Sequence, residues 1–112
     1  MSVMFAVYNE LGFGYKEKYY QKAIEIALKK AEISFKPQCP YKIRYKDEII
    51  GRYYMDFVVE DKIVLKLKAG NYFVKGNINQ TLGYSIATNL KLGILVNFTR
   101  EGIKYKRILN IK

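Results

Sequence analysis

Two runs of alternating apolar residues flank the acidic pair Glu60-Asp61, and they constrain the fold of this chain more than any other feature. Because alternate residues of a strand face the same side of a sheet, the runs predict a β-hairpin with one face in a hydrophobic core. A three-residue loop, 60–62, keeps the two stripes in register and pairs Phe57 with Leu65, whereas a two-residue loop mixes the faces. The core-facing stripe consists of Phe57, Val59, Ile63, Leu65 and Leu67.

The same register gives the opposite face of the hairpin a set of charged residues. It pairs Asp56 with Lys66 and places Lys68 at the next alternate position. One interpretation is a solvent-exposed face on which Asp56 and Lys66 form an ordinary cross-strand ion pair. The other is a site for chemistry, and the hairpin alone favours the first interpretation.

The rest of the chain shows alternating helical and extended patterns. Apolar residues at helical spacing predict a helix over Tyr15–Glu32, and Gly12 is expected to end a shorter helix before it. Pro40 indicates that the first strand is an edge strand or carries a bulge. The order helix, three strands, helix, two strands predicts one α/β (α+β) domain over residues 1–112, with a mixed sheet flanked by helices. The further elements are strands at Ile33–Arg44, Glu48–Val59, Lys62–Lys68, Leu92–Phe98 and Ile103–Leu109, and a helix at Val74–Leu90.

Composition limits the chemistry that is open to the chain. A formal net charge of +10 favours a polyanion such as nucleic acid, although a surface rich in lysine explains the excess equally well. The absence of histidine excludes a Ser-His-Asp triad and a His-ligated zinc site. The single cysteine, the lack of a signal-peptide pattern and the lack of a long apolar stretch predict a cytoplasmic protein that does not span a membrane.

Glu17 is the carboxylate that the helical pattern explains least well. It precedes Ile24 by seven residues and therefore lies near the apolar side of its helix. A carboxylate on a buried side needs a lysine, a backbone amide or a metal ion as its partner. Its place in the first turn offers a simpler role, because an acidic residue there stabilises the helix dipole.

Gly14, Glu17 and Tyr20 fit the pattern G-x-x-E-x-x-Y. With them the chain resembles the small prokaryotic GxxExxY proteins, a branch of the PD-(D/E)XK nuclease-like superfamily. The resemblance implies a restriction-endonuclease-like fold and hydrolysis of phosphodiesters that depends on Mg²⁺ or Mn²⁺. It implies nucleic acid as the partner, DNA rather than RNA, and a homodimer would help a small domain to grip a duplex. The similarity runs from Val7 to Leu109 and includes Asn9–Gly12, Ile43–Lys46, Val59–Lys62, Leu67–Ala69 and Leu92–Phe98.

The resemblance also implies roles for individual residues. The metal ligands that it implies are Glu17, Asp56 and the backbone carbonyl of Leu67. The catalytic residues that it implies are Lys68, Gln80 and Tyr84. Gln80 and Tyr84 have the Q-x-x-x-Y spacing of related exonucleases, although a polar helix face explains them equally well. Contacts to nucleic acid are expected from Tyr20, Arg52 and Lys75.

Position 66 departs from the family pattern, because a (D/E)-x-K element that ends at Lys68 requires an acidic residue there and the chain has Lys66. A protonated lysine cannot coordinate Mg²⁺ and repels it. We therefore expect cleavage to be strongly impaired. The chain is then a natural pseudonuclease, an inactivated enzyme, or a weak nuclease in which Glu17 and Asp56 still hold one metal ion. A non-catalytic protein-interaction or structural subunit with a nuclease fold is the functional alternative.

Overall fold

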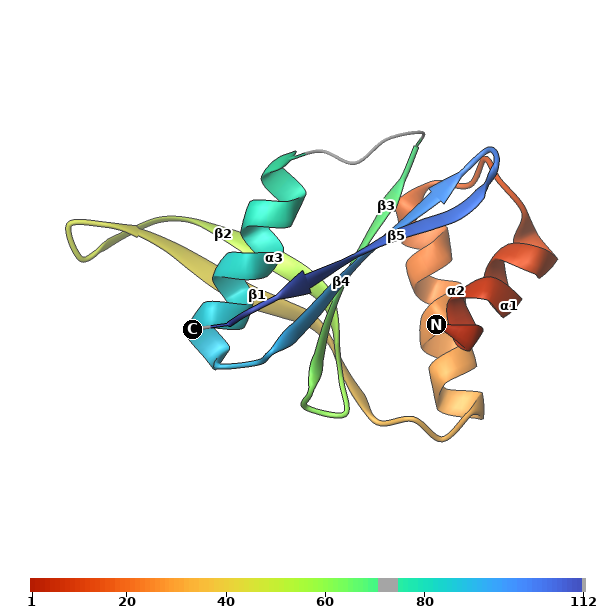
Figure 1. Cartoon of the computed structure of the whole chain (residues 1–112), viewed down its shortest axis with the longest axis horizontal. Coiled ribbons are helices and arrows are strands. Elements are labelled where there is room, and N and C mark those ends of the chain that lie inside the picture. The colour runs from red at the N-terminus through yellow and green to blue at the C-terminus, as the bar shows by residue number, and fades with distance from the viewer. Residues whose placement is uncertain (71–74, 112) are drawn as a thin grey trace.

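The structure of the protein is a computed structural model that describes residues 1–70 and 75–111 (Figure 1). Two N-terminal helices precede three strands, and a third helix connects these strands to the last two. The described residues contain no helix that is both long and apolar enough to span a membrane. The elements are α1 (Ser2–Leu11), α2 (Glu17–Lys30), β1 (Phe35–Tyr45), β2 (Glu48–Val59), β3 (Ile63–Ala69), α3 (Lys75–Thr88), β4 (Leu92–Thr99) and β5 (Gly102–Leu109).

The strands form one five-stranded sheet in the order β1-β2-β3-β4-β5. Strands β3 and β4 run parallel because α3 connects them, and every other neighbouring pair is antiparallel. The register Phe57↔Leu65 and Val59↔Ile63 confirms the three-residue loop. Strand β1 lies at the edge of the sheet, as Pro40 indicated, and its pairing with β2 shifts between Ile43 and Arg44.

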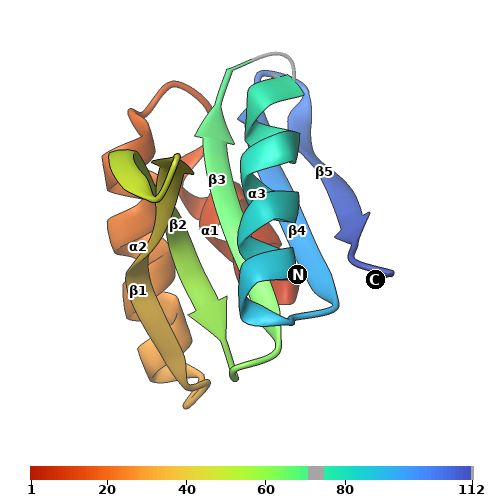
Figure 2. The same cartoon turned by 90° about the vertical axis from the view of Figure 1, so that its left-hand side faces the viewer.

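Helices cover both faces of the sheet, which confirms the expected mixed sheet with flanking helices. Figure 2 shows α3 on one face of the sheet, with α1 and α2 on the other. The predicted stripe packs under α1 and α2, where Phe57, Leu65 and Leu67 meet Ile24 and Leu28. Gly12, with φ 75°, ends α1 as predicted. Helix α1 is a full element of ten residues, so the order begins with two helices rather than one.

Helix α3 packs very closely against β4, and this contact depends on a glycine. A Cβ atom on Gly93 would lie 2.7 Å from Thr81 Cγ2 and 3.4 Å from Ser85 Oγ. The side of the helix that faces β4 carries small polar side chains. The Thr81 hydroxyl donates to the Asn77 carbonyl and the Ser85 hydroxyl donates to the Thr81 carbonyl, both within the helix. The predicted helix began at Val74, which lies outside the described residues.

Strands β1 and β2 continue beyond the sheet as a two-stranded arm, the yellow hairpin that projects from the body in Figure 1. Only residues 57–59 of β2 pair with β3, whereas β1 and β2 pair from Phe35↔Val59 to the turn at Tyr45↔Glu48. We call residues 40–54 the arm. The separation of β2 from β3 creates both the arm and the site described next.

Candidate active site

Asp56 lies at the point where the pairing of β2 with β3 ends. The ladder between these two strands ends at Phe57↔Leu65, so Asp56 and Lys66 are not a backbone pair. The Asp56 side chain reaches across the opening and accepts a hydrogen bond of 2.6 Å from the Leu67 N–H. This contact holds a 9% exposed carboxylate in a fixed place between the strands.

Lys66 faces the same opening from β3. Its Nζ atom donates to the Tyr54 carbonyl oxygen at 3.0 Å and lies 3.9 Å from Asp56 Oδ2. The expected contact between Asp56 and Lys66 is therefore present, although it is made by side chains alone. Both side chains are largely shielded from water, with 17% of Lys66 and 13% of Asp56 exposed. Their interaction is therefore screened less than that of a surface ion pair.

Glu17 meets the end of β3 at the first turn of α2. Glu17 Oε1 lies 2.9 Å from Lys68 Nζ and also accepts a hydrogen bond of 3.4 Å from the Ala69 N–H. A lysine and a backbone amide were two of the three partners that the sequence left open for this carboxylate. Lys16 occupies the N-cap position of α2 and makes no side-chain capping hydrogen bond.

Glu17, Asp56, Lys66 and Lys68 form one electrostatic group, which we call the charge cluster. Burial raises the pKa of Asp56 above its ordinary value, and the charge of Glu17 acts in the same direction. The Leu67 N–H, the Lys66 ammonium and the Lys68 ammonium lower the pKa of Asp56. Two carboxylates and two ammonium groups from α2, β2 and β3 thus balance one another where β2 and β3 separate.

The residues of the charge cluster do not fit a divalent metal ion as they are arranged. Each carboxylate already has a lysine and a backbone N–H as partners. Within the described ranges, no group of three or more His, Cys, Asp or Glu side chains is placed to hold a metal. Mg²⁺ requires several oxygen ligands, and a nearby ammonium opposes its binding. The metal roles expected for Glu17, Asp56 and the Leu67 carbonyl gain no support from this arrangement and stay predictions.

Helix α3 carries the two other expected catalytic residues, and they differ in how deeply they are buried. Gln80 is half-buried on the helix, whereas Tyr84 packs into a second core cluster with Cys39, Met55 and Val64. Burial, together with the neighbouring Cys39 thiol, raises the pKa of Tyr84 to about 12. Tyr84 therefore keeps its proton at neutral pH and can act there only as a neutral hydroxyl.

The three residues expected to contact nucleic acid lie in different surroundings. Arg52 is exposed on the arm, opposite Lys42. Tyr20 is 0% exposed, stacks on Phe98 with ring centroids 4.2 Å apart and donates its hydroxyl to the Gly12 carbonyl. This position gives no support to a nucleic-acid contact by Tyr20. The side chain of Lys75 lies outside the described residues.

Asn97 is a buried polar residue beside the charge cluster that sequence reasoning missed. It is the neighbour of Lys68 in the parallel ladder, is 1% exposed, and neither its amide nitrogen nor its carbonyl oxygen has a hydrogen-bond partner among the described residues. Such groups are rare, because an unpaired buried polar atom is costly. Its position as the one polar side chain within the run Leu92–Phe98 was the available signal.

Comparisons with known proteins connect this geometry to a family. The model of the PD-(D/E)XK nuclease superfamily matches residues 1–108. The crystal structure of SSO0001 is similar over 83% of this chain with a TM-score of 0.64 and 16% sequence identity, which shows the fold alone. This chain spans 50% of the SSO0001 chain. No curated protein matches the sequence. The GxxExxY branch stays a prediction.

Proposed function

Since the chain belongs to the PD-(D/E)XK nuclease superfamily, we propose that it binds nucleic acid at the charge cluster and that hydrolysis of the phosphodiester is strongly impaired. We propose DNA as the preferred partner and the cytoplasm as the location. The observation that carries the proposal is the position of the Lys66 ammonium, 3.9 Å from Asp56 Oδ2 and 3.0 Å from the Tyr54 carbonyl.

Lys66 takes the place of a cation at the buried carboxylate. Two like unit charges about 4 Å apart repel by about 4 kcal/mol at an effective dielectric constant near 20, and a divalent ion doubles the charge on one side. A metal ion beside Asp56 would therefore have to displace the ammonium. An acidic residue at position 66 would instead remove this obstacle and add an oxygen ligand, so Mg²⁺ or Mn²⁺ is the cofactor we propose for that form alone.

The charge cluster nevertheless keeps groups that suit a phosphodiester. Lys68 is one-third exposed, and Lys66 lies in the opening between β2 and β3. An ammonium group can donate to phosphate oxygens when it leaves its carboxylate partner. Binding by this exchange needs no metal ion, and it predicts an affinity that falls as salt rises.

A protein-interaction subunit is the second candidate, and one surface favours it. Exposed apolar side chains gather on α1, α2 and the segment between them, and shallow grooves run between these helices. A large exposed apolar patch is typical of a surface that binds another protein. The exposed residues are Phe5, Phe13, Tyr15, Tyr19 and Ile26.

Plasmid nicking and DNA binding, measured side by side, test the proposal. We expect the protein to bind DNA in EDTA without cutting it, and Lys66→Glu to nick DNA only when Mg²⁺ or Mn²⁺ is added. Asp56→Ala in the Lys66→Glu background is the control, and it should abolish nicking. A folded protein that binds no DNA at low salt would refute the proposal and favour the protein-interaction subunit.

A further inference from the structure

The arm carries cations in an arrangement that opposes its own stability. Lys42 and Arg52 stand directly opposite each other on β1 and β2, and Arg44 follows Lys42 along the edge strand. All three are exposed, and none of them forms an ion pair with another described residue. Like charges at opposite cross-strand positions are destabilising, so a polyanion bound at this surface would remove an existing repulsion.

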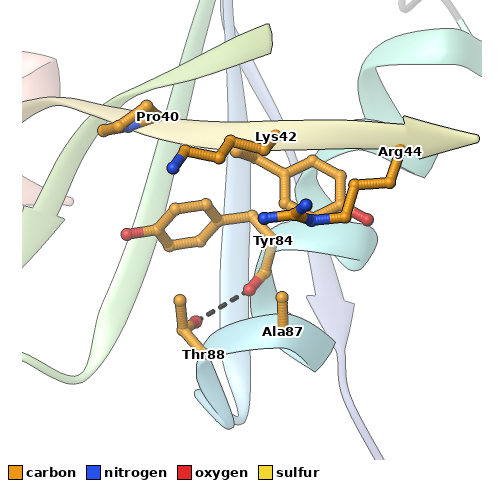
Figure 3. Close-up of a pocket in the computed structure, with 7 residues that line it drawn as sticks. Pro40, Lys42, Arg44, Tyr84, Ala87 and Thr88 are labelled. Atoms are coloured by element: carbon orange, nitrogen blue, oxygen red, sulfur yellow. Dashed lines mark hydrogen bonds between the residues drawn. The ribbon is translucent and has the colours of Figure 1, made fainter. Parts of the chain in front are cut away.

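A groove lies between the arm and the last turns of α3. In Figure 3 the Arg44 side chain extends from β1 toward Tyr84 on the helix, and the Lys42 side chain runs along β1 in the direction of Pro40. Ala87 and Thr88 line the helix side of the same groove. The groove has a volume of about 520 Å³, and none of its lining residues is acidic. Its lining residues are Pro40, Tyr41, Lys42, Arg44, Tyr84, Ala87 and Thr88. We call it the basic groove.

Aromatic packing connects the basic groove to α3. The Tyr41 ring lies against α3 at Gly83, where an added Cβ would come within 3.2 Å of the ring. Tyr41 also stacks on Tyr53 across the arm, with ring centroids 6.4 Å apart. Packing of these aromatic rings holds the arm against α3, so the strand that carries Lys42 and Arg44 lies beside the helix.

We propose that the basic groove binds the phosphodiester backbone of a nucleic acid that also reaches the charge cluster, an inference that rests on the proposed function. Strand β2 connects the two sites: Arg52, which pairs with Lys42 of the groove, precedes Asp56 by four residues, and Tyr54 between them accepts the hydrogen bond from Lys66. At the rise of a strand this separation is roughly 13 Å, which a backbone crosses in a few nucleotides.

The chemistry of the groove favours a nucleic-acid backbone over a small anion. Arginine and lysine bind phosphate oxygens, with arginine giving two parallel hydrogen bonds. The groove is open to solvent rather than enclosed. Exposed cations continue beyond it at Arg52 and at Lys46, which lies over the Tyr45 ring. A series of cations along one arm suits a series of phosphates.

Fluorescence anisotropy with a short labelled DNA duplex tests the groove, using the double variant Lys42→Gln/Arg44→Gln. The matched control is Lys104→Gln/Lys106→Gln, which removes two exposed lysines at the same spacing from β5, the opposite edge of the sheet. We expect the groove variant to bind at least about tenfold more weakly, and the slope of log affinity against log salt to fall by about two. The control should stay within about threefold of the unaltered protein.

Three outcomes decide the inference. Equal affinity and salt slope for the groove variant and the unaltered protein would overturn the inference and leave the proposed function intact. Equal weakening by both double variants would overturn it as well, because net charge alone would then explain binding. Absence of binding by the unaltered protein would overturn both proposals. Repeating the titration with the single strand of the same sequence shows which form of the backbone the groove prefers.

Discussion

In the charge cluster the Lys66 ammonium neutralises the Asp56 carboxylate. Lys66→Glu should remove this neutralisation and make the stability of the folded protein depend on a bound metal ion. The ammonium and the Asp56 carboxylate are 3.9 Å apart and mostly shielded, so their attraction is about 4 kcal/mol at an effective dielectric constant near 20. Charge reversal turns this attraction into repulsion, and relaxation and solvation offset part of the change. We expect a net loss of about 3–5 kcal/mol in the free energy of unfolding, as is typical when a buried ion pair is broken.

Metal binding should restore much of this loss in the variant only. A divalent ion at about 100 times its dissociation constant stabilises a folded protein by about 2.7 kcal/mol. For a domain of this size, the melting temperature should then rise by roughly 10 °C. Thermal unfolding in EDTA and in Mg²⁺ or Mn²⁺ measures this rise, and calorimetric titration of either ion gives the dissociation constant.

Lys66→Met is the matched control, because it removes the ammonium without supplying a carboxylate and should show no response to metal. Asp56→Ala in the Lys66→Glu background should lose the response. The reasoning is refuted if folded Lys66→Glu melts at the same temperature with and without metal, since the site would then lack the ligands that position 66 was expected to complete.

Three further predictions concern Asp56, Asn97 and Gly93. Folding raises the pKa of Asp56 above 3.8, so the folded state holds this proton more tightly than the unfolded state. The free energy of unfolding, relative to that of Asp56→Asn, should therefore fall as pH rises from below 3.8 through the raised pKa. Urea unfolding at several pH values measures this difference. Asn97→Leu should increase the free energy of unfolding by about 1–3 kcal/mol, because it removes two unpaired buried atoms, and a loss of stability in urea would show that the amide is satisfied. Gly93→Ala should reduce stability by about 1–3 kcal/mol through contact with Thr81 Cγ2, and adding Thr81→Ser should reverse most of the loss in the same assay.

The hairpin at the centre of the fold could be predicted in detail. Alternation of apolar residues determined which side of β2 and β3 enters the core, and the need to keep the stripes matched determined the three-residue loop. The contact between Asp56 and Lys66 followed from the same register. The sequence did not show that this contact is made by side chains without backbone pairing, because it carries no sign that β2 separates from β3 at this point.

The partners of the other site residues could not be predicted from spacing. Helical periodicity placed Glu17 near the buried side of α2, yet it left a metal ion, a lysine and a backbone amide open as partners. Tyr20 and Tyr84 fit functional patterns in the sequence, but both pack into hydrophobic clusters. A tyrosine has an apolar ring and a polar hydroxyl, so its sequence pattern alone does not distinguish core from surface.

The sequence by itself determined the order of the elements from α2 onward, the core-facing stripe and the reversed charge at position 66. These features follow from local periodicity and residue chemistry, which act over a few neighbouring residues. Only the tertiary structure decided that Lys68 contacts Glu17, that Asn97, the ladder neighbour of Lys68, has no hydrogen-bond partner within residues 1–70 and 75–111, and that Lys42 and Arg44 line a groove beside α3. Each of these depends on how elements distant in sequence pack, and backbone pairing and side-chain volume determine that packing only when the whole sheet is assembled.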